Sequence, residues 1–142
     1  MQTLPLHTES VRTTERNQMI DVTDRVERIV RTGGIRDGMA IVFVPHTTAA
    51  VTINENADPD VKSDMLQKLS TLIPKQEPYY QHAEGNSDSH VKTSLVGNSV
   101  TVLTEAGRLV LGRWQGIYFC EFDGPRERKM QIKIVSFGEA EH

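Results

Sequence analysis

The segment from Asp58 to Pro74 constrains the fold most tightly, because it predicts a helix with both ends marked. Asp58 is a favourable N-cap, and Pro59 takes the first helical position, where its missing N–H costs nothing. Pro74 ends the run because proline cannot continue a helix. The apolar residues recur at helical spacing between these ends: Val61, Met65, Leu66, Leu69, Leu72 and Ile73. We expect this stripe to face the protein core.

A second amphipathic helix is predicted closer to the start of the chain. Asp21 is placed to act as its N-cap, Asp24 falls in its first turn, and Gly33–Gly34 ends it. Four valines and isoleucines lie at helical spacing between these ends: Val22, Val26, Ile29 and Val30. A shorter helical stretch is expected over residues 90–96.

The rest of the chain is typical of short strands. One or two strands are expected within 2–18, with others at 40–44, 51–53 and 117–122, and a hairpin joins 100–104 to 109–111. Residues 129–134 alternate between apolar and polar side chains, and we expect them to pair antiparallel with 117–122. About seven or eight strands and two main helices predict an α+β fold with a mostly antiparallel sheet. The 142 residues are the size of one compact domain, 1–142.

Composition narrows the possible partners. Lysine and arginine number 16 against 19 acidic residues, a net charge of -3, which argues against charge-driven binding to nucleic acid or membranes. Neither a targeting segment nor an apolar run of membrane-spanning length is visible, so we expect a cytoplasmic protein. The single cysteine, Cys120, lies among aromatic residues and is expected to be a buried thiol.

Residues 74–90 form a long polar segment that carries metal-ligand chemistry. His82, Asp88 and His90 could supply three nitrogen and oxygen ligands to a divalent cation such as Mg²⁺ or Zn²⁺. Gly85 allows the bend that would bring His82 back toward the other two. The alternative is an exposed polar loop with Asx turns.

Two further residues are candidates for acid–base chemistry. His46 follows the predicted strand 40–44, and Glu55 lies between a strand and a helix start with no evident structural role. The alternatives are a hydrogen-bonded histidine at a strand end and a solvent-facing carboxylate.

Arg126 and Arg128 are two residues apart, so in extended backbone both guanidinium groups would share a face and could grip one phosphate. Such a pair after a Gly-Pro turn is otherwise an exposed, solvated one. The amide of Gln115, next to Trp114, offers both a donor and an acceptor.

These motifs, taken in order, resemble the YjbQ family. They are His46-Thr47-Thr48 with Glu55-Asn56-Ala57-Asp58-Pro59-Asp60, the segment His82 to His90, and Gly112-Arg113-Trp114-Gln115-Gly116 with Asp123-Gly124-Pro125-Arg126-Glu127-Arg128. The resemblance implies an α+β subunit, commonly assembled as a homotrimer. The family is also named secondary thiamine-phosphate synthase, an activity that joins a pyrimidine-methyl diphosphate to a thiazole phosphate and releases pyrophosphate.

The resemblance and the residue chemistry together give a set of expected roles. The expected catalytic residues are His46, Glu55, His82, Asp88 and His90, and the expected substrate-binding residues are Asn86, Gln115, Arg126 and Arg128. A cation on the His82/Asp88/His90 cluster and the arginine pair would neutralise the departing diphosphate, so no covalent nucleophile is needed. Two alternatives stay open: metal-dependent hydrolysis of a phosphorylated or amide molecule, with Glu55 or His46 as base, and a binding module without turnover.

Overall fold

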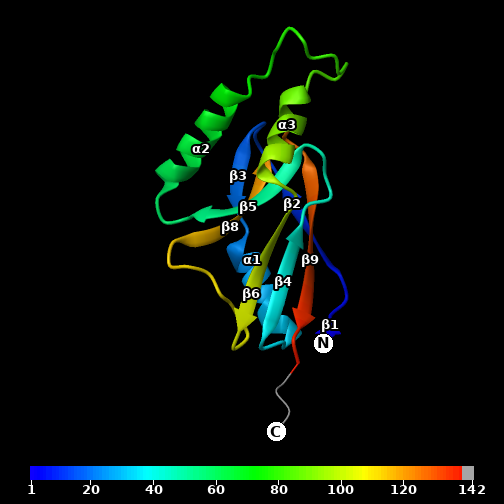
Figure 1. The fold of residues 1–142 in the computed structure, drawn as a ribbon, viewed down its shortest axis with the longest axis vertical. Coiled ribbons are helices and arrows are strands. Elements are labelled where there is room, and N and C mark those ends of the chain that lie inside the picture. The colour runs from blue at the N-terminus through cyan, green and yellow to red at the C-terminus, as the bar shows by residue number, and fades with distance from the viewer. Residues whose placement is uncertain (139–142) are drawn as a thin grey trace.

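Two antiparallel sheets and three helices make up residues 1–138, which the computed structural model describes. The elements are β1 Gln2–Thr3, β2 His7–Arg12, β3 Gln18–Asp21, α1 Thr23–Gly33, β4 Gly38–Phe43, β5 Ala49–Glu55, α2 Pro59–Leu72, α3 Ser87–Val96, β6 Ser99–Glu105, β7 Arg108–Leu109, β8 Gln115–Glu121 and β9 Glu127–Ser136. The α+β, antiparallel prediction is confirmed (Figure 1). None of these helices is both long and apolar enough to span a bilayer.

The large sheet has the order β1-β9-β4-β6-β7, with β2 also on β9, and the small sheet has the order β3-β8-β5. The prediction that the last two strands pair with each other is wrong. Both edges of β8 are taken, one by β3 and the other by β5, so the chain crosses after Glu121 to the large sheet, where β9 pairs with β4. The predicted hairpin is confirmed as β6 and β7.

Strand β8 is buried on both faces because it lies in the middle of three layers. Ile117 and Phe119 point into the main core, which fills the space between the two sheets and α1. Tyr118 and Cys120 alternate with them and join a smaller core beneath α2 and α3. Cys120 is buried, as expected, and burial raises the pKa of its thiol to about 12.

The helices begin and pack differently from their sequence predictions. Helix α1 begins at Thr23, with Val22 as the capping residue, although the Asp21 carboxylate still accepts the Thr23 N–H. Helix α2 has its Asp58 cap, yet none of its residues is fully buried, because it lies only on the edge of the smaller core. Leu72, expected in the core, is 61% exposed. Helix α3 begins at Ser87, three residues earlier than predicted.

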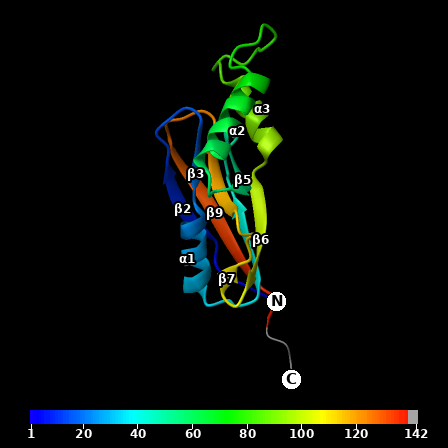
Figure 2. The same ribbon diagram turned by 90° about the vertical axis from the view of Figure 1, so that its left-hand side faces the viewer.

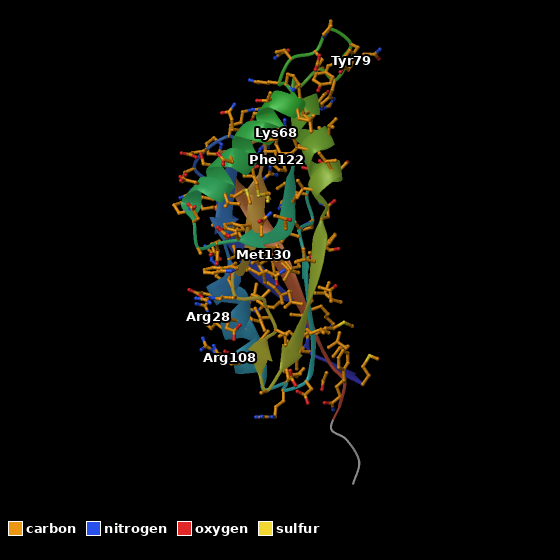
Figure 3. All side chains as sticks on the ribbon, turned by 60° about the vertical axis from the view of Figure 1, so that its left-hand side comes forward. Arg28, Lys68, Tyr79, Arg108, Phe122 and Met130 are labelled. Carbon is orange, nitrogen blue, oxygen red and sulfur yellow. The ribbon has the colours of Figure 1, made fainter. Side chains whose placement is uncertain are left out.

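Helices α2 and α3 lie side by side at one end of the molecule, and their connection extends beyond the strands (Figures 1 and 2). In Figure 3, Tyr79 marks the outer part of this connection, whereas Phe122 and Met130 lie inside the body of the protein. The connection ends at Asn86, where α3 returns the chain to the sheets.

Candidate functional site

A cleft of about 660 Å³ opens where the end of β4, the start of α3 and the turn after β8 meet. Its polar lining residues are His46, Thr47, Thr48, His82, Glu84, Asn86, His90, Asn98, Asp123, Arg126 and Arg128. The volume suits a small molecule. Six of the nine site residues expected from the sequence line this cleft: His46, His82, Asn86, His90, Arg126 and Arg128, of which Asn86 and Arg128 are buried.

The segment between β4 and β5 is held in place by Asn98. The Asn98 side-chain amide donates to the carbonyl oxygens of Val44, at 3.2 Å, and His46, at 2.9 Å. These bonds satisfy backbone carbonyls that no strand partner reaches, because the chain is crossing between the two sheets. His46 therefore sits on a fixed turn.

His46 is held as a neutral imidazole with a defined tautomer. Its Nε2 accepts the backbone N–H of Lys129 at 2.9 Å, so the ring proton of the neutral form is on Nδ1. Burial and the nearby charge of Arg128 lower the pKa of His46 below its usual value. In this arrangement His46 offers a hydrogen-bond donor, whereas the predicted role as a general base needs a free lone pair.

His82 and His90 approach each other edge to face, with 5.4 Å between ring centroids. His90 comes from α3, and His82 comes from the connection that precedes it. Nε2 of His82 lies 4.0 Å from the Glu84 carboxylate, and both side chains are substantially exposed. The bend predicted at Gly85 is present, with a φ of 71°.

Asp88, predicted to join these histidines, points away from the cleft into the protein. Its side chain is fully buried; Oδ2 accepts from Arg16 at 2.9 Å and from Lys92 at 3.3 Å, and Oδ1 accepts from Arg16 at 3.0 Å. Burial alone would raise the pKa of Asp88, but the hydrogen bonds and charges of Arg16 and Lys92 outweigh it and hold this pKa below its usual range. Residues 88 and 90 are on a helix, so their side chains diverge.

This placement leaves the predicted metal ligands apart. Within residues 1–138, no three histidine, cysteine, aspartate or glutamate side chains are grouped closely enough to hold a metal ion. His82 and His90 are the two predicted ligands that do lie together. A divalent cation would therefore need ligands beyond this pair, and the described side chains in this arrangement do not fit a complete protein-only site.

The two arginines have separate environments instead of one shared face. Arg128 is 5% exposed, and its Nε and Nη2 bind the buried carboxylate of Glu121, while Nη2 also donates to the Thr48 hydroxyl at 2.8 Å. Arg126 lies before β9 and is half exposed, with Nη2 bound to Asp123 Oδ2 at 2.9 Å. The predicted two-arginine clamp is therefore not formed, and Arg126 is the more accessible cation.

Glu55 and Gln115 lie at the opposite end of the small sheet. They are paired in register at the far ends of β5 and β8, whereas Thr48 precedes β5 at the cleft. At about 3.3 Å per strand residue, roughly 20 Å separates them from the cleft. The Gln115 amide oxygen accepts the Gly112 N–H at 2.8 Å, which closes the turn around Trp114. Neither residue joins the other predicted site residues within this chain.

Several residues that shape the site carried no clear sequence signal. Lys92 and Glu121 supply buried charges behind the cleft, Arg16 supplies a partly buried one, and Asp123 links two of the lining residues. Each has a partner far away along the chain, 72 residues for Arg16 and Asp88, 75 for Lys92 and Asn17 and 108 for Glu121 and Thr13, so no local motif marks these contacts. The exception is Asp123, which stands in the turn already singled out by the Gly-Pro-Arg motif.

The fold and the cleft together define the class: a small α+β protein with a cleft lined by histidines and an accessible arginine. The family model described as UPF0047 protein YjbQ-like matches residues 7–137, and the chain belongs to this family.

Relatives from distant organisms share nearly the whole chain. UPF0047 protein YugU of Bacillus subtilis is 52% identical over 92% of this chain and 98% of its own length. UPF0047 protein MJ1081 of Methanocaldococcus jannaschii is 49% identical over 88% of this chain and 90% of its own length.

Solved structures agree with the fold. A structure of an uncharacterized conserved YjbQ/UPF0047 family protein from Clostridium acetobutylicum is 53% identical, with a TM-score of 0.89 over 91% of this chain and 99% of that one. A YbjQ-like protein of unknown function from Sulfolobus solfataricus has a TM-score of 0.90 at 30% identity, over 95% of this chain and 98% of that one.

Proposed function

We propose that the cleft binds a small phosphorylated substrate and that the protein is a transferase acting on a diphosphate ester. The observation that carries this proposal is the placement of half-exposed Arg126 in the same cleft as the imidazoles of His82 and His90. A guanidinium group and imidazole N–H donors are suited to neutralising phosphate oxygens. The reaction we favour is the coupling of a pyrimidine-methyl diphosphate with a thiazole phosphate.

In this coupling the thiazole nitrogen attacks the methylene carbon, and the C–O bond breaks as pyrophosphate departs with the electron pair. Arg126 would hold the phosphate oxygens, and the Nδ1–H of His46 would donate to the developing negative charge. A divalent cation, if one binds at His82 and His90 with further ligands from the substrate, would supply additional charge neutralisation.

The direct test is incubation with both substrates and Mg²⁺ or Zn²⁺, followed by chromatography for thiamine phosphate and pyrophosphate. We expect both products in equal amounts, and we expect Arg126→Ala to lower the rate at least about tenfold. Arg12→Ala, which removes an exposed arginine outside the cleft lining, is the matched control. Absence of thiamine phosphate at high enzyme concentration would contradict the coupling reaction.

A second candidate is hydrolysis of the phosphorylated molecule. It is favoured by the His82–Glu84 contact at 4.0 Å, since a carboxylate beside an exposed imidazole supports general-base chemistry on water. The same assay distinguishes the two reactions, because hydrolysis releases pyrophosphate and a pyrimidine alcohol without the thiazole partner. Binding without either product would favour a non-enzymatic module.

We also propose that the protein works as a homotrimer, as the family resemblance implies. Helix α2 has no fully buried residue, and apolar side chains are exposed on α2, α3 and their connection: Leu72, Tyr79, Val91 and Leu95. Contacts with other subunits would cover this surface. The connection carries His82, so such contacts would also steady one wall of the cleft.

A further inference from the structure

The carboxamide of Asn86 is fixed in one orientation within the cleft wall. Its Nδ2 donates to Oδ2 of Asp123 at 2.7 Å. A carboxylate can only accept, so the NH₂ end of the amide must face Asp123, and Oδ1 must face the other way. The same Asp123 oxygen accepts from Arg126 Nη2 at 2.9 Å, which places Asn86 directly beside the accessible arginine.

Asn86 Oδ1 has no hydrogen-bond partner among the residues that the structure describes, although the residue is only 6% exposed. Asn86 is the N-cap residue of α3, where an asparagine oxygen ordinarily accepts an N–H of the first helical turn. Here no such side-chain bond is made, because Asp123 holds the amide in another direction. Leaving a buried acceptor unpaired is costly, so this oxygen calls for a donor from elsewhere.

We infer that Asn86 recognises a hydrogen-bond donor on the ligand, so that the preferred substrates are small phosphate esters with an amino or hydroxyl group a few bonds from phosphorus. This inference rests on the proposed phosphate binding at Arg126. The phosphate lies against Arg126, and the donor reaches the neighbouring Asn86 oxygen. Asn86 lines the cleft, but its oxygen has almost no exposed surface in the free protein, so the amide turns toward the cleft as the donor binds.

The test compares three phosphate esters that differ only in the donor: ethyl phosphate, 2-hydroxyethyl phosphate and 2-aminoethyl phosphate. Calorimetric titration of the full chain should give affinities that rise in this order, with the hydroxyl compound about threefold and the amine about tenfold tighter than ethyl phosphate. The hydroxyl compound matters because it adds no charge. Preference for the amine alone would assign the discrimination to the cleft carboxylates, and it would overturn the inference.

Asn86→Leu should bind all three esters alike, and Glu84→Gln, a change at an exposed cleft carboxylate, should keep the preference for the hydroxyl compound. Because Asn86→Leu also removes a partner of Asp123, a second measurement uses the unaltered protein. The ¹³Cγ resonance of Asn86 should shift on titration with the two donor compounds and stay in place with ethyl phosphate.

The outcomes separate this inference from the proposed function. If all three esters bind equally to the unaltered protein, or the preference survives in Asn86→Leu, the donor recognition is wrong while phosphate binding stands. If none of the three esters binds at millimolar concentration, the proposed function fails and the inference fails with it.

Discussion

At the scale of single residues, Arg126 and Arg128 show how two identical side chains in one motif take different roles. Arg128 is the second residue of β9, and alternation along the strand turns its side chain inward. There it binds the fully buried carboxylate of Glu121. Glu121 also accepts from the Thr13 hydroxyl and from two backbone N–H groups. The buried pair is thus fully hydrogen-bonded, and removing either partner leaves a buried charge.

Substitution should separate the two roles. Arg128→Ala is expected to lower the free energy of unfolding by about 3–5 kcal/mol, because Glu121 is left without its counter-ion. Arg126→Ala should cost less than about 1 kcal/mol, since its pair with Asp123 is partly exposed, yet it should weaken pyrophosphate binding roughly tenfold. Urea unfolding and calorimetric titration measure the two effects. Equal stability losses would contradict the separation.

The His46 imidazole should titrate below the usual histidine range. Its pKa is lowered by burial and by Arg128, so the neutral form is favoured in the folded protein. The neutral imidazole therefore stabilises the folded protein above the unfolded-state pKa of about 6.5. This contribution is lost as the pH falls through the lower folded-state pKa. Protonation must also break the bond from the Lys129 N–H.

NMR titration should therefore show one shared midpoint, below about 6.5, for the His46 ring and the Lys129 amide. His46→Gln keeps an acceptor for Lys129 but removes the titration, so the pH dependence of the Lys129 amide should disappear. Persistence of that dependence in the variant would assign it to another group.

At the scale of elements, α3 is anchored by the charges on its inner face. Asp88 and Lys92 are one helical turn apart and both buried, and Arg16 from the segment between β2 and β3 completes the group. Ser89, between them, donates to the Phe122 carbonyl at 2.6 Å. These contacts set the position of the helix whose N-terminal end carries Asn86 and whose exposed side carries His90 into the cleft.

Asp88→Asn should therefore destabilise the protein even when a chelator removes all metal. The positive charges of Arg16 and Lys92 would lose their buried counter-ion. We expect the free energy of unfolding to fall by about 3 kcal/mol at pH 7. Because the pKa of Asp88 is held low, its contribution is present above about pH 4 and is lost as the pH falls through its folded-state pKa. The stability difference between Asp88→Asn and the unaltered protein should shrink accordingly in acid. If Asp88→Asn lowered stability only when metal is added, Asp88 would be a metal ligand after all.

The helices and strands were easier to predict from the sequence than the pairing of the strands. The caps and breakers at Asp58, Pro59 and Pro74 located α2, and strict alternation located β9, because both signals are local. The pairing of β9 depends on whether β8 has a free edge, and that depends on β3 and β5 far along the chain.

The site followed the same rule. His46, His82 and His90 were found by residue type and do share a cleft. The position of Asp88 could not be inferred in the same way, because its neighbours Arg16 and Lys92 are brought to it only by folding, and the helix reaches back to Ser87. Glu55 was correctly placed between a strand and a helix start, but it pairs with Gln115 at the end of the small sheet far from the cleft.

At the scale of the whole molecule, the connection from α2 to α3 is weakly held by the chain itself. Within the described residues, its hydrogen bonds before Asn86 are local, such as Tyr80 N–H to Glu77 and Gly85 N–H to His82. Ordering each residue costs roughly 1–2 kcal/mol of backbone entropy, which these few bonds do not offset. Tyr79 on this connection is 71% exposed (Figure 3). Leu72, at the end of α2, is also on the surface.

For the proposed homotrimer, light scattering should give a mass of three times the 16.0 kDa chain at micromolar concentration. If the exposed face of α2 and α3 forms the contact, Leu72→Glu combined with Leu95→Glu should shift the mass toward one chain, because each change would bury an unpaired charge. Val110→Glu, at an exposed apolar position beyond β7, is the matched control and should leave the mass unchanged.

Dissociation should also increase amide exchange around His82, since subunit contacts then no longer order the connection. A single-chain mass for the unaltered protein would contradict the trimer. A trimer that survives the double substitution would place its contacts elsewhere, and the connection would then have to be ordered by the ligand in the cleft.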